Sequence, residues 1–215
     1  MTTITADDLK SLIALIAQAM TRERDRLCEL DGAIGDADHG IAMELGFSAA
    51  AKATAELDPA TADPTLVFNT AAKAFLNAVG ASSGPLYATG LMRAGAAVKG
   101  KPSLTADDMV AAFAAIAKGI QDRGKAEVGE KTMVDAWTPA AAACQAAREQ
   151  GMPLEECFSA ALAAAEAGML ATKDMVATKG RSSRLGERAL GHVDPGAASA
   201  TVIVACFHGF FSSQP

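Results

Sequence analysis

Apolar residues recur at helical spacing along most of this chain. The first such run follows Thr5-x-x-Asp8, a pattern typical of an N-terminal capping box. It places apolar side chains on one helix face, at Leu9, Leu12, Ile13, Ile16 and Met20. No segment shows the sustained alternation of apolar and polar residues that indicates a strand. We therefore predict an all-α chain without a sheet.

Capping residues, prolines and glycines divide the chain into eight predicted helices. Thr105-x-x-Asp108 and Thr132-x-x-Asp135 repeat the capping pattern. Asp63-Pro64 and Asp194-Pro195 each pair an N-cap residue with a proline at the first helical position. The helices are predicted over residues 5–30, 39–57, 64–80, 85–100, 105–124, 132–151 and 154–177, and from 195 onwards. Similar helix lengths and mostly short connections predict antiparallel neighbours in one domain, residues 1–215.

The connections between these helices differ sharply in chemistry. In an up-down array, alternate connections lie at the same end of the molecule. The odd-numbered connections, at residues 31–40, 80–85, 123–132 and 178–196, are rich in glycine, charged residues and hydroxyl groups. The even-numbered connections, around residues 58–59, 100–102 and 151–153, have the composition of plain turns. We therefore expect one end of the molecule to carry a functional site.

The first odd connection holds three carboxylates within eight residues, Asp31, Asp36 and Asp38. Mg²⁺ is usually held by a few carboxylates together with substrate phosphates. Acidic clusters also occur on solvated surfaces. The residues that lead into this one are largely apolar, which indicates a partly buried loop and favours a metal site. An EF-hand does not fit, because the twelfth loop position would be Phe47 or Ala42 and not glutamate.

Groups suited to phosphate lie in the same set of connections. Ser82-Ser83-Gly84 before a helix start offers hydroxyl and backbone N–H donors, and so does His39-Gly40. Arg181 is a potential bidentate donor to a phosphate. Each feature alone has an ordinary explanation, as a helix cap or a solvated charge. Together with the carboxylates at the same end, they make nucleotide phosphate the leading hypothesis.

Composition limits the class of protein, its binding partners and its location. The chain has 215 residues, of which 50% are apolar, 20% charged and 5% aromatic, which is typical of a globular protein with closely packed helices. The net charge of −6 argues against nucleic acid. No signal peptide is visible, and the apolar run at 202–211 is too short to cross a membrane. The four cysteines are far apart in the sequence: Cys28, Cys144, Cys157 and Cys206. This spacing predicts free thiols and hence a cytoplasmic location.

Six ordered motifs make nearly the whole chain resemble one family, the L subunit or nucleotide-binding domain of dihydroxyacetone kinases. The motifs are Gly35-Asp-Ala-Asp-His-Gly40, Ser83-Gly-Pro-Leu-Tyr87, Arg123-Gly-Lys-Ala-Glu127, Gly129-Glu-Lys-Thr-Met133, Lys179-Gly-Arg181, and Leu185-Gly-Glu-Arg188 with Gly191-His-Val-Asp-Pro-Gly196. The resemblance implies a barrel of eight antiparallel up-down helices that binds ADP or ATP with two Mg²⁺ ions at one end.

The resemblance also implies roles for individual residues. Asp31, Asp36 and Asp38 match the Mg²⁺ ligands of the family. The nucleotide-binding set matches His39, Gly40, Ile41, Ala42, Ser82, Ser83, Gly84, Gly124, Thr132, Met133, Arg181, Asp194, Pro195 and Gly196. His39 and Arg181 are expected to stabilise phosphate charge. The chain departs from the family pattern at Ala42, often asparagine or threonine, and at Ala81, often glycine.

A kinase of this family needs a partner, because its ketose is held covalently on a histidine of a separate K-type subunit or domain. The resemblance leaves two phosphoryl sources open, exchangeable ATP or bound ADP recharged by a phosphotransferase-system M-type subunit. Two further functions also stay open. One is the equivalent subunit of a kinase for a tetrulose or a fatty acid, and the other is a nucleotide-loaded regulatory subunit that binds a transcription regulator. A ligand-free helical scaffold is the plainest alternative.

Overall fold

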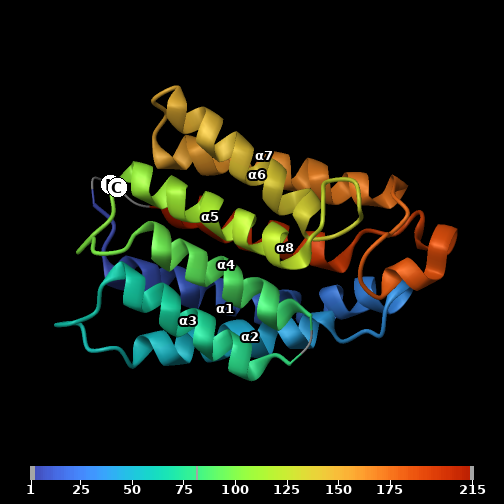
Figure 1. The fold of residues 1–215 in the computed structure, drawn as a ribbon, viewed down its shortest axis with the longest axis horizontal. Coiled ribbons are helices and arrows are strands. Elements are labelled where there is room, and N and C mark those ends of the chain that lie inside the picture. Colours follow the sequence, from blue (N-terminus) through green and yellow to red (C-terminus); the bar gives the residue numbers. More distant parts are fainter. Residues whose placement is uncertain (1–2, 81, 214–215) are drawn as a thin grey trace.

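The computed structural model describes residues 3–80 and 82–213, and its regular structure in these ranges is entirely helical (Figure 1). The prediction of an all-α chain is confirmed. Within the described ranges, the only β-type pairing is an isolated bridge in which Ile4 and Leu104 exchange two backbone hydrogen bonds of 2.8 Å. The helices are α1 (Ala6–Ile34), α2 (His39–Ala55), α3 (Pro64–Ala78), α4 (Ser83–Ala97), α5 (Ala106–Gly124), α6 (Val134–Glu149), α7 (Leu154–Ala171), α8 (Pro195–Ser212), and the 3-10 helices η1 (Thr172–Asp174) and η2 (Ser182–Ala189).

Side-chain caps begin several helices where the sequence predicts them. Thr5 caps α1, because its hydroxyl accepts from the Asp8 N–H at 3.2 Å while the Asp8 carboxylate accepts from the Thr5 N–H at 2.8 Å. Thr105 and Asp108 form the same reciprocal pair at α5. Each capping box satisfies backbone donors that a helix end leaves without intrahelical partners.

Three predicted boundaries are wrong. α1 continues to Ile34 instead of ending near residue 30, so Asp31 lies in its last turn. α4 begins at Ser83, two residues before the predicted proline start. α7 ends at Ala171 and not near residue 177, and η1 follows it directly.

The capping box predicted for the sixth helix forms only in part. Asp135 Oδ2 accepts from the Thr132 N–H at 2.7 Å, but the Thr132 hydroxyl accepts from the Val134 N–H at 3.1 Å. α6 consequently begins at Val134. η2 was not predicted, because its sequence Ser-Ser-Arg-Leu-Gly-Glu-Arg-Ala has no helical apolar period and contains Gly186 in a left-handed conformation.

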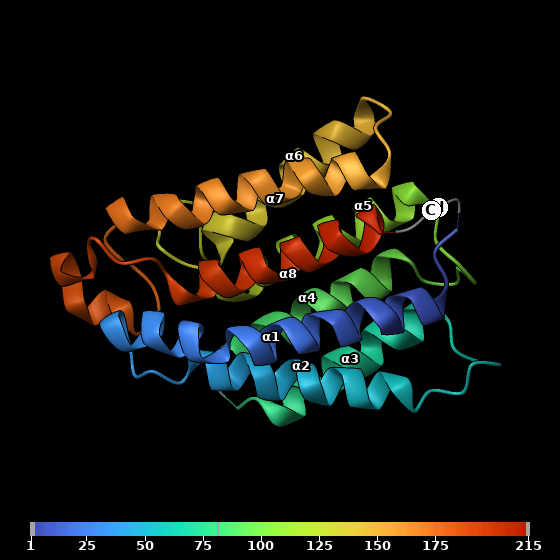
Figure 2. The ribbon, with the colours of Figure 1, turned by 180° about the vertical axis from the view of Figure 1, so that it is seen from behind.

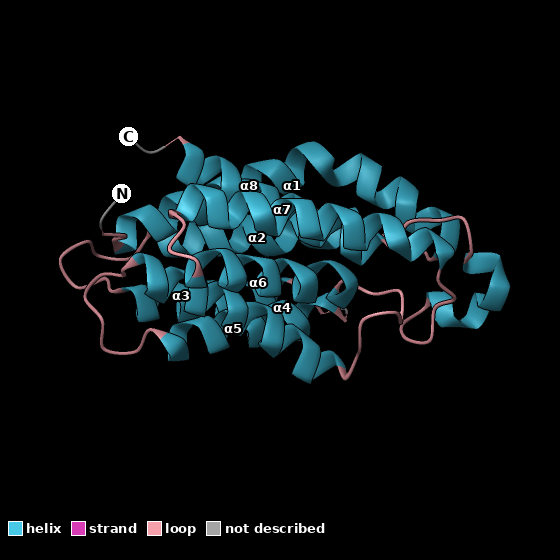
Figure 3. Ribbon diagram, turned by 90° about the horizontal axis from the view of Figure 1, so that it is seen from above, coloured by secondary structure: helices cyan, strands magenta, loops and turns pink. Residues whose placement is uncertain are grey.

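The helices lie along the long axis of the molecule, with loops at its two ends (Figure 3). Each α-helix packs against the next one in the chain, and α8 packs against α1, α6 and α7. Figure 2 shows α8 between α7 and α1. The core joins rings from many helices in a continuous series of contacts, from Phe47, Phe75 and Tyr87 through Trp137 and Phe113 to Phe158 and Phe207.

α8 is the one helix of the described residues that is long and apolar enough to cross a membrane, with a mean hydropathy of 1.3 over 18 residues. The predicted apolar run at 202–211 therefore belongs to a longer helix. However, 72% of this helix is buried against the other helices. Its composition is accordingly that of a central core helix, as the sequence indicated.

Candidate functional site

The four odd-numbered connections meet around one cavity of about 470 Å³. Figure 1 shows the α1–α2 connection in blue and the α7–α8 connection in orange and red at the same end. A volume of this size is typical of a small-molecule site. The wall is formed by Asp31, Asp36, Asp38, His39, Ala42, Ser82, Ser83, Pro85, Leu86, Ile120, Arg123, Gly124, Ala126, Lys131, Thr132, Met133, Val134, Lys179, Gly180, Arg181, Ser182, Asp194, Pro195 and Gly196.

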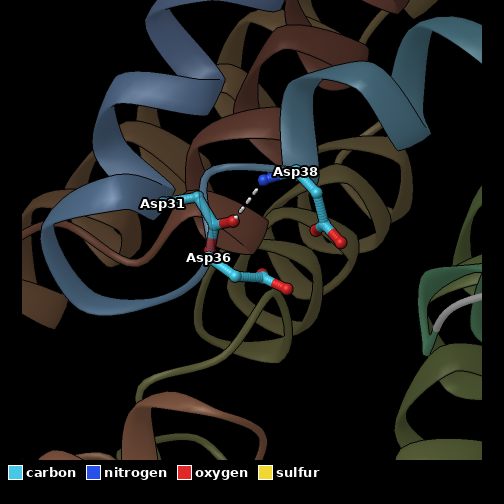
Figure 4. Close-up of side chains that lie close together, drawn as sticks. All are labelled: Asp31, Asp36 and Asp38. Atoms are coloured by element: carbon cyan, nitrogen blue, oxygen red, sulfur yellow. Dashed lines mark hydrogen bonds between the residues drawn. The ribbon is translucent and has the colours of Figure 1, made fainter.

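Three carboxylates converge at the α1–α2 connection (Figure 4). Asp31, Asp36 and Asp38 each offer an oxygen, and these oxygens all lie within 4.8 Å of one another. Asp31 is buried in the last turn of α1, whereas Asp36 and Asp38 are about half exposed. Ala37 between them has a φ of 62°, a conformation that residues other than glycine rarely adopt. A group of hard oxygen donors at this spacing fits Mg²⁺.

Asp31 also organises the loop that carries the other two carboxylates. Its Oδ2 accepts from the backbone N–H of Asp38 at 3.0 Å and of His39 at 3.3 Å, so it caps the start of α2 from another helix. Asp38 occupies the N-cap position of α2 but makes no capping hydrogen bond with its side chain. Burial, followed by the charge of Asp31, raises the pKa of the Asp38 carboxyl. The cluster therefore favours a bound cation, because a cation lowers the cost of holding these charges together.

Arg181 reaches the carboxylates from the α7–α8 connection. Its guanidinium forms ion pairs with Asp36 and with Asp38, the latter at 3.3 Å. The expected phosphate donor thus lies beside the expected metal ligands. Its side chain is about half exposed, so its head group can be reached from the cavity.

His39 is held by Ser199, a residue that no sequence motif singled out. Its Nε2 lies 2.8 Å from the hydroxyl of Ser199, which is fully buried on α8 and also donates to the Gly196 carbonyl at 3.0 Å. Burial lowers the pKa of the His39 imidazole, against the opposing effect of Asp31. Burial therefore disfavours the charged form of His39, whose ring is held in the cavity wall by α8.

Three predicted nucleotide residues lie outside the cavity wall. A Cβ at Gly40 would be 2.0 Å from the Arg24 carbonyl oxygen, and a Cβ at Gly84 would be 2.0 Å from the Val79 carbonyl oxygen. These glycines allow close backbone approach. The side chain of Ile41 is 48% exposed and does not line the cavity. Ala81, one of the departures from the family pattern, lies outside the described residues.

The opposite wall comes from the α5–α6 connection and the start of α8. The predicted residues Gly124, Thr132 and Met133 line it, as does the Asp194-Pro195-Gly196 segment. Asp194 is buried and caps α8, because its Oδ2 accepts from the Ala197 N–H at 2.7 Å. Burial, the largest influence, raises the pKa of the Asp194 carboxyl to about 7.

Two buried polar residues support this wall, of which Asp135 was predicted only as a helix cap and Lys131 was not singled out. Asp135 shapes the α5–α6 connection, because its carboxylate accepts from the Gly129 N–H at 2.5 Å and from the Thr132 N–H at 2.7 Å. Lys131 appeared only inside a motif, yet its side chain is buried and lines the cavity. A lysine between a glutamate and a threonine in a loop gives no sequence signal of burial.

Comparisons with known proteins agree on one family. The family described as DAK2 domain matches residues 33–209. The chain is 40% identical to "PEP-dependent dihydroxyacetone kinase 2, ADP-binding subunit DhaL" of Listeria innocua, over 85% of this chain and 84% of that protein. It is 42% identical to "PEP-dependent dihydroxyacetone kinase, ADP-binding subunit DhaL" of Escherichia coli, over 82% and 83% respectively.

A more distant likeness extends to solved structures. The fold is similar to that in the "Crystal structure of the dihydroxyacetone kinase from C. freundii in complex with AMP-PNP and Mg2+", with a TM-score of 0.71 at 21% identity. The match covers 97% of this chain but only 34% of the other chain. The "L-erythrulose kinase" of Pectobacterium atrosepticum is 29% identical, and the chain spans 36% of its length. These longer proteins therefore contain a region of this fold.

Proposed function

The chain belongs to the DAK2 domain family, and from that premise we propose that it is the ADP-binding, phosphoryl-transferring subunit of a dihydroxyacetone kinase. One observation carries the proposal. Four connections, remote from one another in sequence, bring a Mg²⁺-type carboxylate cluster and phosphate-type donors to the wall of a single cavity. The relatives named as ADP-binding subunits match this chain over more than four fifths of its length.

We assign the metal to the carboxylate cluster. Asp31, Asp36 and Asp38 would hold Mg²⁺, with two ions expected from the family resemblance. When bound, Mg²⁺ supplies charge neutralisation and orientation to the phosphates. The protein's own contribution is to hold the three carboxylates close together through the Asp31 cap on α2 and the left-handed Ala37.

The nucleotide would lie across the cavity between its two walls. The phosphate groups would face Ser82, Ser83, His39 and Arg181, with Ala42 contributing only backbone and methyl group. Gly40, Ile41 and Gly84 could contribute only backbone N–H groups at the starts of α2 and α4. The base and sugar would face Gly124, Thr132 and Met133, and Asp194, Pro195 and Gly196 would close the site.

Phosphoryl transfer of this kind is mostly positioning and electrostatic stabilisation. Arg181 carries a full positive charge beside the carboxylates and would offset charge on the transferred group. The His39 ring is fixed by Ser199 and would act as a hydrogen-bonding group. The helices would form one domain, a closed up-down barrel, that holds these groups in place.

The subunit would act with partners. The ketose would be bound on a K-type subunit. The relatives' names, "PEP-dependent" or "PTS-dependent" and "ADP-binding subunit", favour bound ADP recharged by a phosphotransferase system over exchangeable ATP. The recharging protein would be an M-type subunit, and the complex would lie in the cytoplasm. The four relatives named as ADP-binding subunits are 34–42% identical, whereas the structure that holds AMP-PNP is 21% identical. A second candidate, a kinase for a tetrulose, is favoured by the matches to two L-erythrulose kinases at 29% and 32% identity.

The purified chain provides the first test. We expect about one ADP per chain, released on denaturation and identified by absorbance and mass. Alone, the chain should not phosphorylate dihydroxyacetone, and addition of its K-type subunit with the phosphoryl donor should restore turnover. Robust ketose kinase activity of the isolated chain, free of K subunit, would contradict this division of labour. Higher turnover on erythrulose in the reconstituted complex would favour the second candidate.

A further inference from the structure

Lys131 is a buried cation in the cavity wall that the proposed function leaves without a role. Its side chain is 1% exposed. The ammonium donates to the backbone carbonyl of Thr172 and, at 2.6 Å, to that of His192. Among the described residues, no carboxylate lies within 4.0 Å of it. Its charge is therefore held chiefly by two backbone carbonyls.

Two influences shift the pKa of the Lys131 ammonium in opposite directions. Burial lowers the pKa of its ammonium, while the carboxylates of Asp194, Asp135 and Asp174 raise it. A buried charge is retained only where hydrogen bonds and nearby opposite charges offset the loss of water. Both conditions are met here, so the burial of this lysine depends on the fold around it.

The backbone at Lys131 is also unusual. Its φ is 58°, in the left-handed region that non-glycine residues adopt only at a cost. Such a conformation persists where surrounding contacts hold it in place. The two hydrogen bonds of the ammonium are contacts of this kind, because they fix the side chain inside the molecule.

These bonds join two segments that are distant in sequence. Lys131 precedes Thr132 and Met133, and His192 precedes Asp194; all but His192 line the cavity. Thr172 adds a second connection, because its hydroxyl accepts from the Asp194 N–H at 2.9 Å. The two segments lie side by side, since a Cβ added at Gly196 would be 3.4 Å from Met133. We call the set Lys131, Thr172, His192 and Asp194 the Lys131 link.

We propose that Lys131 is a positioning residue for the nucleotide: through the Lys131 link it fixes the segment 192–196 against residues 131–133. This inference rests on the proposed function, because it assigns both segments to the wall that holds ADP. Lys131 acts through backbone carbonyls and not by touching the nucleotide. Loss of its ammonium leaves two buried carbonyls without their donor, and the segment 192–196 then loosens.

The main test compares Lys131→Met with Lys125→Met. Lys125 lies in the same connection, also has a left-handed backbone with a φ of 49°, and is exposed. For Lys131→Met we expect amide hydrogen exchange at 192–196 to accelerate tenfold or more, and the Kd for Mg²⁺-ADP to rise about tenfold. Lys125→Met should change both by less than twofold. Lys131→Arg, which keeps charge and donors, should recover part of the protection.

A second variant removes a different hydrogen bond of the Lys131 link. It also provides a test if Lys131→Met does not fold. Thr172→Val removes the hydroxyl that accepts from Asp194 and leaves the buried ammonium in place. We expect faster exchange at 193–196 and weaker Mg²⁺-ADP binding here also, with smaller changes than for Lys131→Met.

The outcomes separate the two proposals. Wild-type exchange at 192–196 in both variants, or an equal acceleration over all helices, would overturn the Lys131 link as a local device. Wild-type affinity for Mg²⁺-ADP despite faster local exchange would overturn its role in positioning the nucleotide. Failure of the wild-type chain to bind Mg²⁺-ADP would instead overturn the proposed function, while the exchange comparison would still decide whether the link holds the segment.

Discussion

The two ends of the helix array follow different rules. At the end opposite the cavity, α1 and α5 begin with reciprocal capping boxes, and Ile4 pairs with Leu104 beside them. At the cavity end, the helix connections contain Ala37, Lys125 and Lys131, the non-glycine residues with positive φ in the described chain. Buried Asp31, Lys131, Asp135 and Asp194 are also there. One end is built from features that stabilise, and the other retains strain and buried charge, which is the usual sign of a functional site.

The largest expected effect is selective stabilisation of the cavity end by its ligand. A ligand that binds only the folded state adds RT ln(1 + [L]/Kd), about 2.7 kcal/mol at a hundredfold excess over Kd. Mg²⁺-ADP should raise the melting temperature clearly, and ADP with a chelator much less, as calorimetry can measure. Hydrogen exchange should slow mainly in the odd-numbered connections. Equal shifts with and without Mg²⁺ would contradict the role given to the carboxylate cluster.

Substitution of the half-exposed carboxylates should come next. Asp36→Asn or Asp38→Asn removes a charged ligand, and we expect Mg²⁺-ADP affinity to fall tenfold or more, equivalent to about 1.4 kcal/mol. Asp58→Asn is the matched control, because Asp58 lies in an even-numbered connection and caps only a local turn. Titration calorimetry would refute the prediction if all three variants bound Mg²⁺-ADP like the wild type.

The raised pKa of Asp194, at the cavity end, predicts that the free energy of unfolding depends on pH. Its pKa is about 7 in the folded protein against 3.8 ordinarily, so between these values the folded state retains a proton that the unfolded state has lost. Its contribution to stability is full below pH 3.8 and is lost as pH rises towards 7, by about 1.4 kcal/mol per pH unit. Asp194→Asn keeps a capping oxygen and should flatten this slope. Denaturant titrations of the nucleotide-free protein at several pH values would measure it, and an unchanged slope would exclude Asp194 as its source.

The smallest effect on stability and ligand affinity should come from a substitution at the end opposite the cavity. Thr105→Ala removes a capping hydroxyl from α5 and should lower the free energy of unfolding by about 1 kcal/mol. Because Thr105 lies far from the cavity, Mg²⁺-ADP affinity should stay within twofold of the wild type. A large loss of affinity in this variant would show that the two ends are more tightly coupled than the comparison allows.

The sequence predicted what local chemistry determines. The capping boxes of α1 and α5 and the proline starts of α3 and α8 were found, because these signals act within a few residues. The carboxylates Asp31, Asp36 and Asp38 were found for the same reason, since their loop is short. The all-α class and the grouping of the odd-numbered connections followed from periodicity and from the count of helices.

What the sequence could not show depends on contacts between distant segments. Ser199 was missed because its link to His39 spans 160 positions along the chain. Lys131 was missed because its burial depends on carbonyls near residues 172 and 192. The predicted end of the seventh helix was wrong because the apolar pattern continues beyond Ala171, where η1 and the Thr172 carbonyl meet Lys131. Gly40 and Gly84 were matched as phosphate residues, yet their lack of a side chain is explained by close backbone packing.

The opposite directions of α1 and α8 have a practical consequence for attachment of the chain. α1 begins and α8 ends at the end opposite the cavity, because the last turn of α1 and the first turn of α8 both line the cavity. A fluorophore, surface tether or additional domain joined beyond either helix would therefore extend away from the cavity mouth. The entrance would stay open to a macromolecule as large as a second subunit, even with both termini immobilised.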